Sequence, residues 1–334
     1  MPLAAPVRAL RPAPLKGAAP SWAAEAQGPH LWDAHGRRHL DMSCAGGAAL
    51  LGHAEPRVEA AAADPAQDAE ARAAHALAGR LTAAGGLRFT ACAQDARRAA
   101  ITLAVRATDR VHVIEVAGAE DLPSPTVRLS EIAAFMVDVA APPSVMHRAR
   151  VLASAAGALL ILDDTASGLR RNPSGCGGPD LTVLGDALAN GRPIGAVAGE
   201  VELLAHLPDL QPAAPASLAA AAAVLSIVER EDVALQLAVR GAEIQAELEA
   251  VFATTGAAEA VQVGGDPTGV TLRFGGPDAG RLRRRFLAQL SARGVHAPGV
   301  LHVSTRHGDA EIGELLDAVA AAALLLAQRA PRAA

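Results

Sequence analysis

Five short apolar runs between residues 111 and 198 constrain the fold of this chain more than any other feature. They lie at residues 111–116 (VHVIEV), 133–139, 158–162, 181–184 and 194–198. Such runs are typical of strands buried on both faces, as in a parallel sheet. Helical spacing at 144–155 separates the second run from the third. This alternation predicts an α/β fold with a mostly parallel, doubly wound central sheet flanked by helices.

The flanking segments predict the rest of the architecture. Residues 1–29 have the composition of an extended arm, and residues 30–42 predict a hairpin around Gly36. Residues 55–84 predict helical structure that is broken at Pro65. Residues 216–252 have the spacing of two helices. The C-terminal part has the pattern of a smaller α+β domain. Its predicted strands lie near 261, at 270–274 and at 301–304, and its predicted helices at 280–293 and 310–328. We therefore divide the chain into an arm and hairpin that join the small domain (1–55), a large α/β domain (56–215), and a long helix with the small C-terminal domain (216–334).

Charge and hydropathy exclude several classes of protein. The formal net charge is −5, which argues against binding nucleic acid through net positive charge. Stretches of 18 apolar residues without charges are absent, and the N-terminus lacks the apolar core of a signal peptide. The cysteines Cys44, Cys92 and Cys176 show no CxxC spacing, so we expect neither a disulfide framework nor a metal site. We expect a cytoplasmic protein that binds no nucleic acid and no membrane.

Four motifs carry a resemblance to a known family. They are PVRA (6–9) followed by GPHLWDAHGRRHLDM and LLGHAEPRV, then ALLILDDTASGLR (158–170), PDLTVLGDALANGRPIGAVAG (179–199), and GVHAPGVLHVSTRHGDAEIGELLDA near the C-terminus. In this order they resemble class III (fold type I) aminotransferases, and most of all glutamate-1-semialdehyde aminomutases. The resemblance implies a pyridoxal phosphate (PLP)-dependent transferase fold. The segment between Gly118 and Ala133 is much shorter than in the family.

The residues that the family uses to hold PLP are mostly replaced in this sequence. The resemblance places Asp186 where the family has the lysine that binds the cofactor as a Schiff base, and the chain's single lysine, Lys16, lies in the N-terminal arm. The family's phosphate-binding motif NSGTEA reads ACAQDA (91–96) here, without its glycine and both hydroxyls. The family's ring-stacking aromatic falls in the shortened segment, and its phosphate-binding threonine aligns near Pro212.

Two family positions are retained. Asp163 matches the partner of the cofactor's pyridine nitrogen, and Arg8 matches the arginine that the aminomutases associate with a substrate carboxylate. Since four of the five cofactor contacts are absent, we expect that the protein uses no cofactor. Asp163 and Asp186 should then share one cleft, where two carboxylates cannot both ionise easily, so that one pKa rises and the pair divides the general acid and general base roles. Arg8 would anchor a substrate carboxylate. In the alternative interpretation, Asp186 only caps the following turn or pairs with Arg192.

Cys44 and Cys92 fall in segments that line the family's cleft, and the candidate substrate-binding residues besides Arg8 are Cys44, His53, Cys92 and Gln94. The structural alternatives are a turn-stabilising role for His53 and small-residue replacement of serine for the cysteines. The first hypothesis for function is a PLP-independent isomerase, lyase or cyclase that acts by acid/base catalysis on a small amino-acid-like carboxylate. The alternatives are a catalytically dead homologue that serves as a structural or regulatory partner, and a noncovalent PLP or PMP enzyme. We expect a homodimer, as in the family.

Overall fold

The computed structural model describes residues 23–81, 85–116, 118, 121, 128–166, 168–171 and 178–327. The predicted site residue Arg8 lies outside these residues, as do Lys16 and Cys176. In the described part of the chain, no helix is long and apolar enough to cross a membrane.

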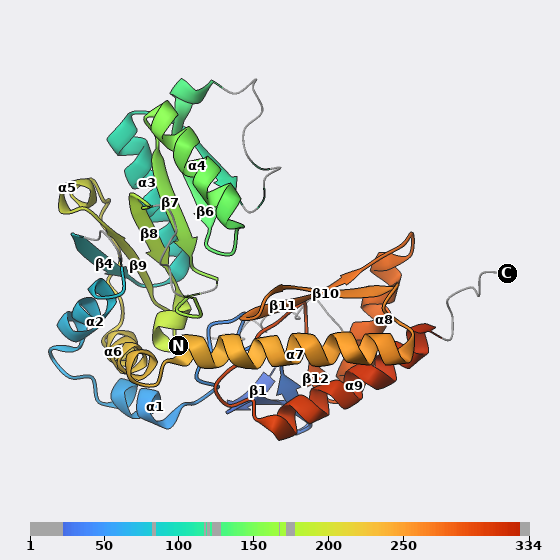
Figure 1. The fold of residues 1–334 in the computed structure, drawn as a ribbon. Helices are drawn as coiled ribbons and strands as arrows, with labels where there is room; N and C mark the ends of the chain where they lie inside the picture. Colours follow the sequence, from blue (N-terminus) through green and yellow to red (C-terminus); the bar gives the residue numbers. More distant parts are fainter. Residues whose placement is uncertain are drawn as a thin grey trace, which may run out of the picture.

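The central sheet has six strands: β4 (Gly86–Thr90), β5 (His112–Val116), β6 (Ile132–Asp138), β7 (Leu159–Asp164), β8 (Leu181–Leu184) and β9 (Gly195–Gly199). Their order is β4-β9-β8-β7-β6-β5 (Figure 1). Strands β5 to β8 are parallel, whereas β9 runs antiparallel to both of its neighbours. All five apolar runs therefore form strands, but the parallel direction predicted for residues 194–198 is wrong. An apolar run reports burial and does not encode the direction of a strand.

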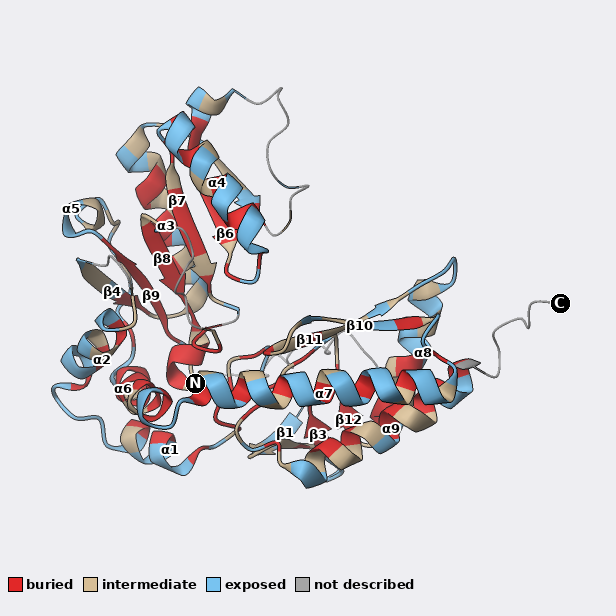
Figure 2. Cartoon of the chain, in the orientation of Figure 1, coloured by how far each residue is buried: buried red, intermediate tan, exposed pale blue. Residues whose placement is uncertain are grey.

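Helices cover the two faces of this sheet. The helix α3 (Ala93–Thr108) packs with Ala134 and Met136 of β6, whereas α4 (Pro143–Ala156) packs with Phe135 and Val137 of the same strand. Because successive side chains of a strand point to opposite faces, the two helices lie on opposite sides of the sheet. Figure 2 shows the resulting buried interior along β7 and β8.

A helical layer connects the sheet to the C-terminal part. It contains α1 (Pro56–Ala63), α2 (Ala69–Ala78) and α6 (Pro215–Arg230), followed by the long helix α7 (Val233–Thr255). The break between α1 and α2 falls at Pro65, as predicted. Glu55 caps α1 by accepting hydrogen bonds from the backbone N–H groups of Arg57 and Val58. Short helical turns precede β6 (Leu129–Glu131), follow β8 (Asp186–Ala189) and follow β9 (α5, Val201–Leu204).

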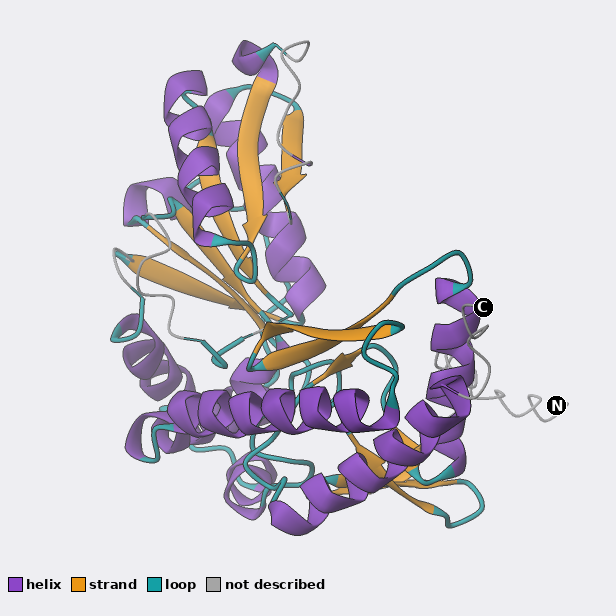
Figure 3. Cartoon of the chain, turned by 45° about the vertical axis from the view of Figure 1, so that its right-hand side comes forward, coloured by secondary structure: helices purple, strands orange, loops and turns teal. Residues whose placement is uncertain are grey.

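Two small sheets and two helices form the C-terminal part. One sheet joins β10 (Val261–Asp266), β11 (Gly269–Phe274) and β13 (Val300–Leu301), and the helices are α8 (Ala279–Ala292) and α9 (Asp309–Ala327) (Figure 3). The other sheet joins the N-terminal strands β1 (Ala23–Gln27), β2 (His30–Asp33) and β3 (Arg38–Asp41) to β12 (Val295–His296). Since β3 pairs with β12 in parallel, the N-terminal hairpin is part of the C-terminal layer.

The last predicted strand is shorter than expected. The sequence predicts a strand over residues 301–304, but β13 ends at Leu301. The backbone N–H of His302 instead donates to the carbonyl oxygen of Met42, at 2.7 Å, and that of Thr305 to Leu50, at 3.0 Å. This segment is therefore bound to the loop after β3 rather than to a sheet.

Candidate functional site

A polar cavity of about 290 Å³ lies at the carboxyl ends of the parallel strands β5, β6 and β7. It is lined by Arg97, Glu115, Val116, Asp121, Met136, Asp138 and Asp163. Ligands of α/β sheets bind beyond the carboxyl ends of the strands, so this is the position where the fold places reacting molecules. Of the residues predicted from the sequence, Asp163 lines this cavity.

Both carboxylate oxygens of Asp163 are engaged by this chain's own donors. Its Oδ1 accepts hydrogen bonds from the backbone N–H of Thr165, at 3.0 Å, and from the Thr165 hydroxyl, at 2.6 Å. Its Oδ2 accepts a hydrogen bond from Nε of Arg97, at 2.8 Å. The carboxylate is therefore fixed in orientation and paired with a cation.

Arg97 projects from the second turn of α3 and connects two strands. Besides Asp163 at the end of β7, its Nη2 contacts Oε2 of Glu115 in β5 at 2.8 Å. The hydrogen bonds to Glu115 and Asp163 raise the pKa of Arg97 above its ordinary value. A guanidinium is a planar fork that suits two carboxylates at once. Arg97 therefore carries a permanent positive charge at the cavity wall.

A second carboxylate in the cavity belongs to Asp138. Its Cα pairs with that of Asp163 in the parallel register of β6 and β7, so the two side chains end adjacent strands. Asp138 Oδ1 accepts a hydrogen bond from the backbone N–H of Ala140, at 2.7 Å. Sequence reasoning expected two carboxylates in one cleft, and the structure brings together Asp138 and Asp163.

Asp186 does not line this cavity. It begins the helical turn after β8, and its Oδ1 accepts a hydrogen bond from the backbone N–H of Ile194 at 3.2 Å. Arg192, the other partner considered for Asp186, instead contacts Glu59 at 2.5 Å. Asp186 therefore neither caps the turn after β8 nor pairs with Arg192; its side chain instead holds the backbone just before β9.

The two candidate residues at the start of α3 have different environments. Cys92 is the half-buried N-cap of the helix and makes no capping hydrogen bond through its side chain, while its carbonyl oxygen accepts a hydrogen bond from the Thr90 hydroxyl at 2.9 Å. Gln94 is exposed. Neither residue lines the cavity at Asp163.

Cys44 and His53 are held inside the structure rather than presented to a ligand. The thiol of Cys44 is buried and contacts the carbonyl oxygen of His302 at 3.2 Å, and burial raises its pKa to about 12 even though Arg170 acts in the opposite direction. His53 Nε2 lies 2.7 Å from Oδ2 of the buried Asp41. Hence the structure places Cys44 in the core and His53 in contact with a buried carboxylate, and neither residue lines the cavity at Asp163.

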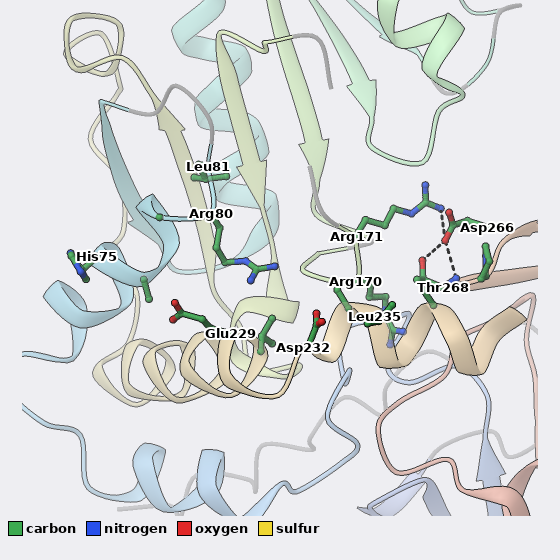
Figure 4. A pocket seen from close by; sticks show the side chains of 16 residues that line it. His75, Arg80, Leu81, Arg170, Arg171, Glu229, Asp232, Leu235, Asp266 and Thr268 are labelled. Carbon is green, nitrogen blue, oxygen red and sulfur yellow. Dashed lines mark hydrogen bonds and ion pairs between the residues drawn. The ribbon is translucent and has the colours of Figure 1, made fainter. Parts of the chain in front are cut away.

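A larger cavity, of about 1040 Å³, lies between α2, α6, the start of α7 and the β10–β11 turn. Figure 4 shows the guanidinium of Arg80 with the carboxylates of Glu229 and Asp232 below it, and Arg171 directed toward Asp266. Arg171 and Asp266 are 3.5 Å apart. None of the predicted site residues that the structure describes lines this cavity, and we place the candidate site at Asp163.

Three residues of the candidate site were missed by sequence reasoning: Arg97, Glu115 and Asp138. A signal was present for Arg97, because an arginine one turn after the helix start at Cys92 can reach the ends of the neighbouring strands. Glu115 and Asp138 each stand at or near the end of an apolar run, where parallel strands present polar side chains.

Searches against family models give no match. Two curated relatives are glutamate-1-semialdehyde 2,1-aminomutases: that of Bordetella avium is 26% identical over 407 aligned positions, covering 96% of this chain and 95% of that protein. The enzyme of Herminiimonas arsenicoxydans is 25% identical, and the alignment covers 97% of this chain and 95% of that protein.

Solved structures show the same fold. The FumI protein of Sphingopyxis sp. MTA144 superposes with a TM-score of 0.81 at 22% identity, covering 96% of this chain and 93% of that one. An omega-transaminase from Sphaerobacter thermophilus superposes with a TM-score of 0.79 at 22% identity, and the superposition covers 94% of this chain and 93% of that one. The chain therefore has the fold of the class III, fold type I PLP-dependent aminotransferases and is similar over nearly its whole length to glutamate-1-semialdehyde 2,1-aminomutases.

Proposed function

We propose that this protein is a PLP-independent enzyme on an aminomutase-like scaffold, which moves a proton on a small amino-acid-like molecule in an isomerisation, elimination or cyclisation. The observation that carries the proposal is the polar cavity at the carboxyl ends of β5 to β7. It holds Asp138 and Asp163, which end adjacent strands, and the guanidinium of Arg97, which is paired with Asp163. Such a set can bind a zwitterion and exchange a proton with it.

The residues present do not fit PLP. A Schiff base needs an amine, and Asp186 offers a carboxylate at the position that the resemblance assigns to the lysine. At the start of α3, Ala91, Cys92 and Ala93 supply no hydroxyl for a phosphate. Asp163, which would face the ring nitrogen, is already paired with Arg97. The donor set therefore supports a reaction without this cofactor.

The charges of the cavity suit an amino acid. The remaining N–H groups of Arg97 can bind a substrate carboxylate. Asp138 can accept a hydrogen bond from the substrate ammonium group or take a proton from a substrate carbon. The proton is returned by the same carboxylic acid to another atom of the substrate, so that the side chain ends the cycle as it began. Arg8 remains our proposed second anchor for a substrate carboxylate. Asp186 does not line this cavity, and its proposed acid/base role is tested separately below.

Deuterium exchange tests this function without knowledge of the product. The purified protein is incubated in D₂O with a panel of free amino acids, and mass spectrometry measures deuterium at carbon. We expect exchange into at least one amino acid with the wild type, and its loss in Asp138→Asn and Asp163→Asn. Asp95→Asn is the matched control, since Asp95 pairs with Arg98 and does not line the cavity. Asp186→Ala, assayed alongside, tests the predicted role of that residue.

Two results would contradict the proposal. One is exchange that persists unchanged in both Asp138→Asn and Asp163→Asn. The other is a visible absorbance band in the purified wild type, or after addition of PLP followed by desalting, because that band would show retained cofactor. The second result would favour a noncovalent PLP or PMP enzyme.

One observation favours a catalytically dead homologue that works as a structural or regulatory partner. Leu235 and Val239 stand one turn apart on α7 with 58% and 51% of their surface exposed, and exposed apolar side chains in a row are typical of contact surfaces. We also propose a cytoplasmic homodimer. Light scattering on the wild type and on Leu235→Glu/Val239→Glu tests the assembly, since a monomeric wild type contradicts the dimer.

A further inference from the structure

Arg97 contacts two of the acidic residues that line the cavity. It pairs with Asp163 through Nε and with Glu115 through Nη2, both at 2.8 Å. Asp163 is mostly buried, with 15% of its side chain exposed, whereas Glu115 is 61% exposed. The guanidinium thus enters from α3 and covers the inner carboxylate, while its outer end meets Glu115 near solvent.

We propose that Arg97 is an internal cation that fills a binding position for flat cations on Asp163, and that it is the residue that determines which ligands this cavity accepts. With Arg97 in place, an external guanidinium or pyridinium ring finds Asp163 already paired. Without Arg97, the same position is open to such a group. The inference deepens the proposed PLP independence, because the barrier to a pyridine ring then lies in Arg97 as well as in the missing lysine.

The geometry of Asp163 supports this role. Thr165 holds Oδ1 with two hydrogen bonds and leaves Oδ2 directed at Arg97. A carboxylate fixed by a neighbouring turn keeps its orientation when its cation is removed, because Thr165 belongs to the same segment and not to α3. The position is therefore preorganised for a donor at Oδ2.

The adjacent carboxylates strengthen the preference for a cation. Asp138 pairs with Asp163 in the strand register, and Glu115 lines the same cavity. Removing the charge of Arg97 leaves Asp163 and Glu115 without the cation that pairs with both of them. A small flat cation can replace the guanidinium in charge and shape, whereas an anion is repelled.

Binding of two small probes to Arg97→Ala tests the inference. The probes are methylguanidinium, which reproduces the lost group, and pyridoxine, which carries the pyridine ring without an aldehyde. We expect calorimetric titration to show both probes binding Arg97→Ala at least about tenfold more tightly than the wild type. The thermal midpoint of the variant should rise with either probe. Arg98→Ala is the matched control, since Arg98 is the next residue, is exposed, and pairs with Asp95.

The double variant Arg97→Ala/Asp163→Asn decides whether Asp163 is the receptor. The inference predicts that both probes lose their gain in affinity. It is overturned if Arg97→Ala binds the probes no better than the wild type, or if the double variant binds them as tightly as Arg97→Ala. Arg97→Gln replaces Arg97→Ala should the smaller side chain prevent folding. Failure here leaves the proposed function intact, because deuterium exchange by the wild type is measured separately.

Discussion

Asp163 and Asp164 are consecutive residues at the end of β7, and they face opposite sides of the sheet. Asp163 lines the polar cavity with Arg97, whereas Asp164 borders a small enclosed space that Leu81, Leu169 and Leu184 line together with Arg80 and Arg171. Asp164 is 6% exposed, and its Oδ1 has no hydrogen-bond partner in the described part of the chain. Burial, together with the charges of Asp163 and Asp138, raises the pKa of Asp164 to about 8.

Asp164 should make the protein less stable as the pH rises. Between pH 4 and 8 the unfolded chain has lost this proton and the native chain keeps it, so the free energy of unfolding decreases with pH. Asp164→Asn removes the titration. Between pH 5 and pH 7 the free energy of unfolding of the variant, measured with urea, should rise by about 3 kcal/mol relative to that of the wild type.

A constant difference between wild type and Asp164→Asn at the two pH values would contradict the shifted pKa. The control is Asp180→Asn, since Asp180 is part exposed and pairs with Arg150 at 2.9 Å.

His302 should make the protein less stable as the pH falls, which is the opposite of the effect of Asp164. Burial lowers its pKa to about 4, with the charge of Arg170 acting in the same direction and the Thr268 carbonyl opposing it. The unfolded chain therefore takes up a proton near pH 6.5 while the native chain does not, so stability falls as the pH drops from 6.5 to 4. Between pH 7 and pH 5 the free energy of unfolding, measured with urea, should fall by about 2 kcal/mol less in His302→Gln than in the wild type. Equal losses in wild type and variant would refute a neutral buried His302.

The central strands could be located from the sequence because their signal is local. Apolar runs at 181–184 and 158–162 reappear as β8 and β7, within two residues of the predicted bounds. The strand β4 carries no such run, and the direction of β9 depends on its partners rather than on its own residues. Arg97 and Asp163 are 66 positions apart and meet only because α3 packs across the sheet. A single sequence predicts segments well and contacts of this kind poorly.

Arg170 connects the loop after β3 to the C-terminal segment, and its loss should be costly. The buried guanidinium donates from Nε to the carbonyl oxygen of Gly47 and from Nη1 to that of Val303, both at 2.6 Å. Arg170→Met leaves both carbonyls without this donor, so we expect a loss of about 3 kcal/mol or more in chemical denaturation. Arg171→Met is the control, with a loss below about 1 kcal/mol, because its ion pair with Asp266 is partly exposed. Equal losses in the two variants would argue against the assigned role.

Gly241 marks the closest approach of α7 to the β10–β11 turn, and it should not tolerate any side chain. A Cβ built at this position would lie 1.7 Å from the carbonyl oxygen of Pro267, which is backbone and cannot swing aside. Gly313 in α9 is also helical, but a Cβ there meets nothing within 4 Å. Since alanine favours a helix over glycine by about 1 kcal/mol, Gly313→Ala should stabilise the protein by up to that amount. Gly241→Ala should instead destabilise it by several kcal/mol, because relieving the clash separates α7 from the turn. Thermal unfolding of the two variants beside the wild type decides the point, and a stabilised Gly241→Ala would show that the two elements do not pack this closely.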